Sequence, residues 1–131
     1  MTRVLFVCVH NAGRSQMAES FLNHFAKERG LKIEAVSAGT ASGASLNPLA
    51  VQAMNELGIS MEGHKPKLLT QELADSADQT VTMGCGVGAC SAKVLVSEDW
   101  GLNDAAGQPI ERVREIRDQI RAKVEGLIEH L

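Results

Sequence analysis

The 131-residue sequence has no tyrosine, only three cysteines, and neither a basic run nor a long apolar run. Its formal net charge of -3 at pH 7 gives no reason to expect a nucleic-acid partner. The apolar stretches are too short to cross a bilayer, and the segment after Arg3 is strand-like rather than the cleavage site of a signal peptide. We therefore expect a cytoplasmic protein that binds neither nucleic acid nor membrane.

The odd number of cysteines argues against a fixed disulfide framework, and in the cytoplasm all three would be reduced at rest. The sequence has no visible linker, internal repeat or low-complexity segment. With 44% hydrophobic residues it can form a proper core, so we expect residues 1–131 to be a single domain. We also expect the chain to be a monomer.

Strand-like and helix-like segments alternate along the chain. Apolar, often branched residues predict strands at 4–7, 32–37, 79–83 and 93–96. Helical spacing of apolar residues predicts helices over 17–26, 49–57, 69–77 and 110–131. Gly30, Gly58 and Pro109 stand where the first two helices should stop and the last should begin. This alternation predicts an α/β fold in three layers, a four-stranded parallel sheet with helices on both faces.

The stretch VLFVCVHNAGRSQMAES joins the first predicted strand to the first predicted helix. Cys8 ends the strand, and open α/β sheets bind their ligands at loops in this position. Such a loop directs backbone N–H groups and a helix N-terminus at one point, which suits a tetrahedral oxyanion, and Gly13 would permit the tight bend. We expect the oxyanion-binding residues to be Val9, His10, Asn11, Ala12, Gly13, Arg14 and Ser15.

Two side chains of this stretch indicate catalysis as well as binding. The planar guanidinium of Arg14 can hold an oxyanion through two hydrogen bonds. The positive field of the loop favours the thiolate of Cys8, the form that attacks, and Ser15 could donate a hydrogen bond to it. The alternative is a buried strand-end cysteine beside a solvated arginine. The strand before the loop, the glycine within it and the helix after it favour the oxyanion site.

Three further residues should gather at the same edge of the sheet, because the carboxyl ends of parallel strands lie together. Cys85 and Cys90 lie among glycines, which packed strands and helices avoid and a flexible loop that carries a thiol would use. The alternatives are an inert loop or a zinc site, for which only His10 and His64 are nearby candidates. Asp104 could be a turn residue, or in protonated form a general acid for a leaving oxygen.

Across its whole length the sequence resembles the thiol-linked arsenate reductases built on the low-molecular-weight protein tyrosine phosphatase fold. The resemblance is carried by CVHNAGRSQMAE, SAGT, NPLAVQAMNELGI, TMGCGVGAC, EDWGLNDAAG and ERVREIRDQI. A cysteine soon after TMGC, followed by EDWGL, is closer to the reductases than to the phosphatases. The resemblance implies no bound cofactor and no metal, with thioredoxin or another thiol reductant as electron donor.

The resemblance also implies roles for individual residues. Cys8 would be the nucleophile, Arg14 the oxyanion clamp and Asp104 the acid, while Cys85 and Cys90 would form the redox relay. Ser15 and Asn11 would support the loop. The substrate would be arsenate, with phosphate or sulfate as competing anions, and the product arsenite.

The sequence departs from the family at two places. Ala105 follows Asp104, where the family usually has proline, and this would loosen the acid's loop. Some members hold a potassium ion near the anion loop with an acidic residue, and here the segment GHKPK has Lys67 instead. We therefore expect no potassium site, with the charge of Lys67 in its place.

Two other functions are compatible with such a loop. A protein tyrosine phosphatase would share the loop, but the eukaryotic enzymes place aromatic rings beside the acid, and here Asp104 is followed by Ala105, Ala106 and Gly107. A non-catalytic oxyanion or redox sensor would bind the anion and switch its cysteines without turnover.

Overall fold

The structure is a computed structural model that describes residues 2–41, 43–83, 98–102 and 107–131. Its centre is a four-stranded sheet in the order β2-β1-β3-β4, with every neighbouring pair parallel. The strands are β1 (Thr2–Cys8), β2 (Ile33–Gly39), β3 (Gln79–Thr82) and β4 (Glu98–Asp99). The predicted parallel α/β fold is confirmed. The predicted strand at 93–96 lies outside the described residues, and β4 begins at Glu98.

The described residues form four helices in the order that the apolar spacing predicted: α1 (Arg14–Arg29), α2 (Pro48–Asn55), α3 (Gln71–Ser76) and α4 (Ile110–Ile128). Gly30 ends α1 in the left-handed conformation, at φ 65°. The side chains of Asn47 and Thr70 cap α2 and α3 by accepting hydrogen bonds from backbone N–H groups. Leu131, predicted to continue the apolar stripe of α4, lies beyond its end.

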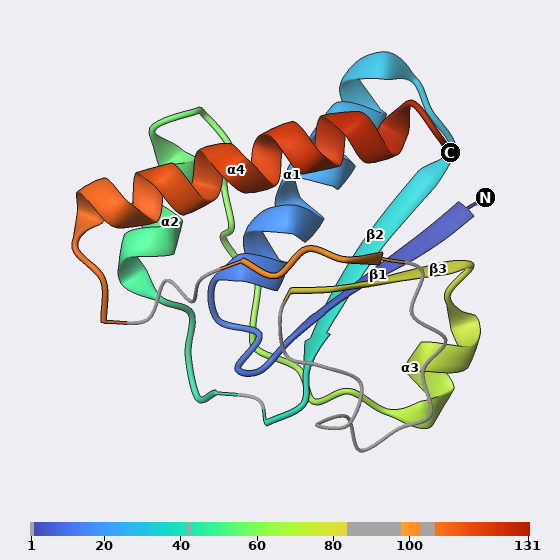
Figure 1. The fold of residues 1–131 in the computed structure, drawn as a ribbon, viewed down its shortest axis with the longest axis horizontal. Coiled ribbons are helices and arrows are strands. Elements are labelled where there is room, and N and C mark those ends of the chain that lie inside the picture. Colours follow the sequence, from blue (N-terminus) through green and yellow to red (C-terminus); the bar gives the residue numbers. More distant parts are fainter. Residues whose placement is uncertain (1, 42, 84–97, 103–106) are drawn as a thin grey trace.

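The helices cover both faces of the sheet, as Figure 1 shows. Alternate residues of β1 point to opposite faces, so Val4 and Phe6 join the larger core, which also contains side chains of α1, α2 and α4. Leu5 and Val7 join a smaller core against which α3 packs. All these side chains are fully buried, which explains the unbroken apolar run of this strand.

An ion-pair cluster fastens the end of α2 to α4. The carboxylate of Glu56 accepts hydrogen bonds from Arg114 at 2.6 Å and from Arg117 at 2.8 Å. The hydrogen bond from Arg114 is the largest of the causes that lower the pKa of Glu56 below its ordinary value. The same pairing raises the pKa of Arg114.

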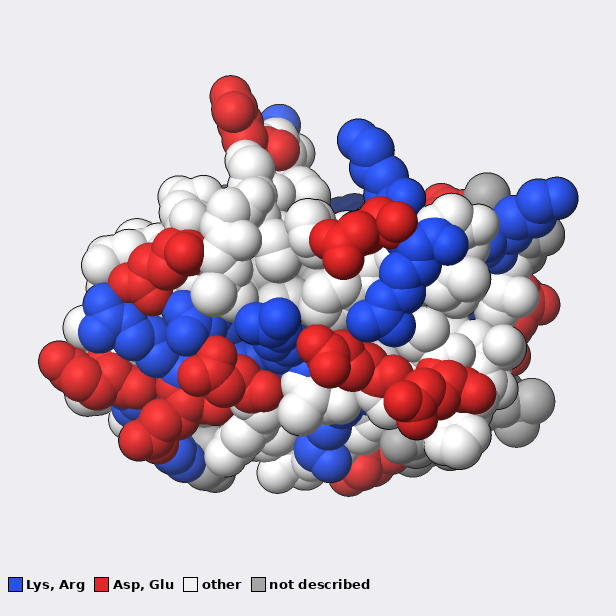
Figure 2. Space-filling view, turned by 90° about the horizontal axis from the view of Figure 1, so that it is seen from above, with Lys and Arg blue, Asp and Glu red and all other residues white. Residues whose placement is uncertain are grey.

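Charges of both signs alternate over the face that includes α4. Figure 2 shows lysines and arginines lying beside acidic side chains over this face. In the described part of the chain, no helix has the length and apolar character needed to cross a membrane.

Candidate active site

The loop between β1 and α1 lies at the carboxyl edge of the sheet (Figure 1). Cys8 ends β1 and is paired with Gly39 of β2, and α1 begins at Arg14. The cap residue of α1 is Gly13, which has no side chain to occupy the helix N-terminus. The first N–H groups of a helix have no carbonyl partner within the helix, so a helix N-terminus without a capping side chain suits an anion.

The carbonyl groups of the loop face away from its centre. Those of Cys8, Val9, His10 and Ala12 accept hydrogen bonds from backbone N–H groups of residues 40–47, at 2.8 to 3.0 Å. In a trans peptide the N–H of the next residue points the opposite way, so the loop's N–H groups are directed inward. The N–H of Asn11, 3.2 Å from Cys8 Sγ, follows this pattern.

The thiol of Cys8 is buried and receives polar contacts from two residues. Its Sγ lies 2.8 Å from Ser15 Oγ and accepts a hydrogen bond from the Asn11 N–H. Ser15 Oγ in turn accepts a hydrogen bond of 2.8 Å from Asn11 Nδ2, which leaves the hydroxyl proton of Ser15 to be directed at the sulfur. The sulfur thus has two potential donors, the Ser15 hydroxyl and the Asn11 N–H.

Asn11 holds the shape of the loop. It is fully buried and adopts the left-handed conformation, at φ 53°, which asparagine tolerates better than most residues. Gly13, predicted to permit the tight bend, lies with residues 9–12 in a bend and has φ -138°, while the left-handed residue of the loop is Asn11. Its Oδ1 accepts hydrogen bonds from Gln16 Nε2 at 2.9 Å and from the Lys67 N–H at 2.8 Å.

Arg14 connects the loop to the segments that directly follow β3 and β4. The guanidinium is buried, and its Nη1 donates to the carbonyl oxygens of Met83, just after β3, and of Leu102, at 2.8 Å. Arg14 therefore lies at the same sheet edge as Cys8.

The remaining predicted site residues, Cys85, Cys90 and Asp104, lie outside the described residues. The carbonyl groups of Met83 and Leu102 contact Arg14. Met83 directly precedes the segment that contains Cys85 and Cys90, and Leu102 directly precedes the segment that contains Asp104.

Gly39 was not predicted as a site residue, although the motif SAGT contains it. A Cβ at this position would lie 2.5 Å from Val9 O and 2.9 Å from Asn11 N. The loop backbone thus packs directly on the end of β2, and only glycine leaves room for it. The signal in the sequence was the glycine at the end of the second strand.

A polar cluster lies behind the loop; two of its residues were named from the sequence, Lys67 in place of a potassium ion and His64 as a candidate zinc ligand, but not their contacts with Glu19. Glu19 is largely buried, and its carboxylate lies 3.2 Å from His64 Nδ1 and 3.6 Å from Lys67 Nζ. The same carboxylate accepts a hydrogen bond from Ser37, and Gln16 lies 3.0 Å from His64 Nδ1. The available signal was a row of polar residues at helical spacing in an otherwise apolar part of α1.

No group of three or more potential metal ligands occurs in the part of the chain that the structure describes. The two histidines considered for zinc have other neighbours. His10 Nδ1 lies 3.3 Å from the Ala41 carbonyl oxygen, and His64 belongs to the polar cluster.

Comparison with known sequences finds one family pattern, low molecular weight phosphotyrosine protein phosphatase, matching residues 3–131. A glutaredoxin arsenate reductase of Synechocystis is 39% identical over 98% of this chain and 97% of its own length. An arsenate reductase of Staphylococcus epidermidis is 32% identical over 94% of this chain and 93% of its own.

Solved structures of both phosphatases and arsenate reductases are similar to this chain. A low-molecular-weight protein tyrosine phosphatase from T. tengcongensis has a TM-score of 0.88 and 28% identity over the full length of both chains. An arsenate reductase in the phosphate-binding state has a TM-score of 0.81 and 34% identity, covering 99% of this chain and 98% of that one. A thioredoxin-dependent arsenate reductase of Corynebacterium glutamicum has a TM-score of 0.80 and 33% identity, covering 99% of this chain but 61% of that one.

Proposed function

This chain belongs to the low molecular weight phosphotyrosine protein phosphatase family, and within that family we propose that it is an arsenate reductase whose nucleophile is Cys8. The observation that carries the proposal is the environment of Cys8 Sγ, with the Ser15 hydroxyl at 2.8 Å and the Asn11 N–H at 3.2 Å. An inward-facing set of N–H groups and the buried guanidinium of Arg14 lie at the same sheet edge. The relatives named arsenate reductases support the choice of substrate.

The first step joins Cys8 to arsenic. The loop N–H groups and Arg14 hold arsenate, and the Cys8 thiolate attacks the arsenic atom. Asp104 gives its proton to the departing oxygen, which leaves as water. The product is a covalent adduct between Cys8 sulfur and arsenic, which is still As(V).

The second step transfers the electrons. The Cys85 thiolate attacks Cys8 sulfur, a disulfide forms, and the sulfur–arsenic bond breaks with its electron pair left on arsenic. Arsenic is thereby reduced from As(V) to As(III), and arsenite leaves. The two thiols supply both electrons.

The third step regenerates the nucleophile. Cys90 attacks Cys85, the Cys8 thiolate is released, and the Cys85–Cys90 disulfide is reduced by an external thiol reductant. We assign this reductant as thioredoxin, with glutaredoxin as the alternative that one relative's name suggests. A reducing cycle of this kind suits the cytoplasm, where we propose that the protein works as a single-domain monomer.

The polar cluster behind the loop has a positioning role in this scheme. Glu19, His64 and Gln16 hold the Asn11 side chain, and Asn11 holds Ser15 against Cys8. The ammonium of Lys67, 3.6 Å from Glu19, supplies the positive charge that a potassium ion gives in some relatives.

Phosphatase activity is the second candidate, because the T. tengcongensis phosphatase has a TM-score of 0.88 to this chain. Hydrolysis would need only Cys8, Arg14, Asp104 and water, and would leave Cys85 and Cys90 without a role. The test is arsenite formation from arsenate with thioredoxin, thioredoxin reductase and NADPH, measured beside hydrolysis of a small aryl phosphate. Continuous arsenite formation is expected; aryl phosphate hydrolysis without arsenite would make the protein a phosphatase, and binding without either turnover would make it a sensor.

A further inference from the structure

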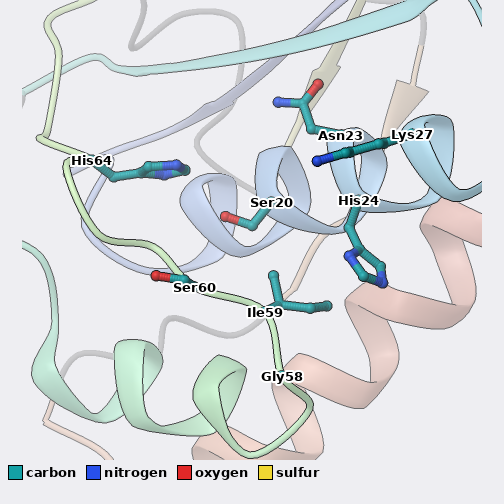
Figure 3. A pocket seen from close by; sticks show the side chains of 8 residues that line it. All are labelled: Ser20, Asn23, His24, Lys27, Gly58, Ile59, Ser60 and His64. Atoms are coloured by element: carbon teal, nitrogen blue, oxygen red, sulfur yellow. The ribbon is translucent and has the colours of Figure 1, made fainter.

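A pocket of about 250 Å³ lies beside α1, and none of the residues of the Cys8–Ser15 stretch lines it. Four of its residues come from α1 and four from the segment that follows α2 (Figure 3). Most of these side chains carry nitrogen or oxygen, and none is an aspartate or glutamate. The lining residues are Ser20, Asn23, His24, Lys27, Gly58, Ile59, Ser60 and His64.

Ser20 has a polar atom that the fold does not satisfy. The residue is 5% exposed, and its Oγ has no hydrogen-bond partner within the described part of the chain. In Figure 3 this oxygen points toward the space between His64 and Ser60. A buried hydroxyl without a partner costs free energy, and helical serines commonly avoid this cost by bonding to a carbonyl of the preceding turn. A ligand in the pocket would supply the missing partner.

Two further groups are available to the same ligand. The amine of Lys27 points into the pocket in Figure 3 and has no ion pair among the residues that the structure describes. His64 uses Nδ1 toward Gln16 and Glu19, at 3.0 and 3.2 Å, so that its Nε2 remains for the pocket. With Nδ1 facing a carboxylate, the proton of the neutral ring lies on Nδ1 and Nε2 is an acceptor.

The other polar side chains of the pocket are already engaged. Asn23 exchanges two hydrogen bonds with the backbone of Ala35, at 2.8 and 3.1 Å. His24 pairs with Glu28 at 3.3 Å. Ser60 Oγ accepts a hydrogen bond from the Glu62 N–H. The groups left for a ligand are therefore a cation, a hydroxyl and an imidazole acceptor.

We propose that this pocket is a second oxyanion site, which binds a tetrahedral anion that keeps one proton, such as hydrogen phosphate or hydrogen arsenate. Lys27 and Ser20 donate to two of its oxygens, and its own O–H donates to His64 Nε2. Because a water occupies about 30 Å³ in the liquid, the pocket has room for such an anion and some of its hydration. The site shares His64 with the polar cluster behind the loop, but Lys27 and Ser20 have no part in the proposed reductase mechanism, so their variants test the second site separately.

The test is a titration of the ¹⁵N-labelled protein with inorganic phosphate at constant pH and ionic strength. Two saturable sets of amide shifts are expected, one at residues 9–15 and one at residues 20–27 and 58–64. Lys27→Gln and Ser20→Ala should each weaken binding at the second set by about tenfold, the effect of losing one hydrogen bond to a charged group. Both variants should leave binding at residues 9–15 unchanged.

Lys123→Gln is the matched control, because Lys123 is an exposed lysine of α4 without an ion pair in the described residues. This substitution removes one positive charge, as Lys27→Gln does, and should change phosphate binding neither at residues 9–15 nor at the pocket. Sulfate, which has no proton to donate at neutral pH, should bind the second site more weakly than phosphate does. The proposal is wrong if the amides of residues 20–27 and 58–64 do not shift with phosphate, or if their binding curve equals that of residues 9–15 in every variant. It is also wrong if Lys123→Gln weakens phosphate binding at the pocket as much as Lys27→Gln does.

Discussion

Replacing Gly39 by alanine should displace the oxyanion loop without touching any reacting group. The added Cβ would lie 2.5 Å from Val9 O, whereas real Cβ contacts essentially never fall under 3.0 Å, so the carbonyl must retreat by at least 0.5 Å. The other close atoms, Asn11 N at 2.9 Å and His10 C at 3.0 Å, are also backbone and cannot rotate away. The Val9 carbonyl shares its peptide with the His10 N–H, one of the inward-facing donors.

A misplacement approaching 1 Å can cost about 10² in rate, so we expect Gly39→Ala to slow single-turnover arsenite formation by roughly 10- to 100-fold. Phosphate affinity should fall as well, and the overpacking should cost about 1–3 kcal/mol of stability. Thermal unfolding would show whether the variant is still folded at the assay temperature.

The control is Gly126→Ala in α4, where an added Cβ meets nothing within 4 Å. It should leave the rate unchanged and stabilise the helix by about 0.5–1 kcal/mol. A folded Gly39→Ala protein with the rate and phosphate affinity of the wild type would refute the claim that this loop geometry controls the chemistry.

Three other substitutions test separate parts of the account. Ser15→Ala removes the contact at 2.8 Å from Cys8 Sγ and should slow single-turnover arsenite formation by about 10-fold or more, while a rate equal to the wild type would make Ser15 a packing residue only. Asp104→Asn should slow the same step by about 10²–10⁴-fold and largely preserve phosphate binding, and an unchanged rate would make Asp104 a turn residue. Glu56→Gln should lower the melting temperature at pH 7. The pKa of Glu56 in the folded protein lies below its ordinary value of 4.5, so the ionised carboxylate stabilises the fold above that pH, and this stabilisation is lost as the carboxylate is protonated in acid. The melting temperatures of the wild type and of Glu56→Gln should therefore converge at low pH. A difference that stays constant with pH would contradict the ion pairing of Glu56 with Arg114.

The parts of the fold that depend on local pattern were predictable from the sequence. The apolar run of β1 indicated a strand buried on both faces, and Val4 and Leu5 indeed belong to different cores. Gly30 and Pro109 marked helix ends because their backbone preferences act within one turn. The oxyanion loop was recognisable because strand, loop and helix are continuous in sequence.

The parts that depend on tertiary contacts were missed. His64 reaches Gln16 across 48 positions of sequence, and nothing in either local stretch announces that contact. A side chain at position 39 would collide with the backbone of residues 9–11, which follow β1, and this contact is not visible in the sequence around Gly39. The left-handed conformation of Asn11 was not predicted either, because the side-chain contacts of Asn11 with Ser15 and Gln16 that accompany it are visible only in the structure.

The most direct test of the reductase mechanism is the amount of arsenite that the Cys90→Ser protein releases. Cys8 and Cys85 together supply two electrons, so this variant, reduced and then freed of reductant, should release one arsenite per chain and stop. Mass spectrometry of the digested protein should find a Cys8–Cys85 disulfide, and Cys85→Ser should release no arsenite. Continued turnover of Cys90→Ser with thioredoxin at the wild-type rate, or arsenite release by Cys85→Ser, would contradict the three-thiol relay.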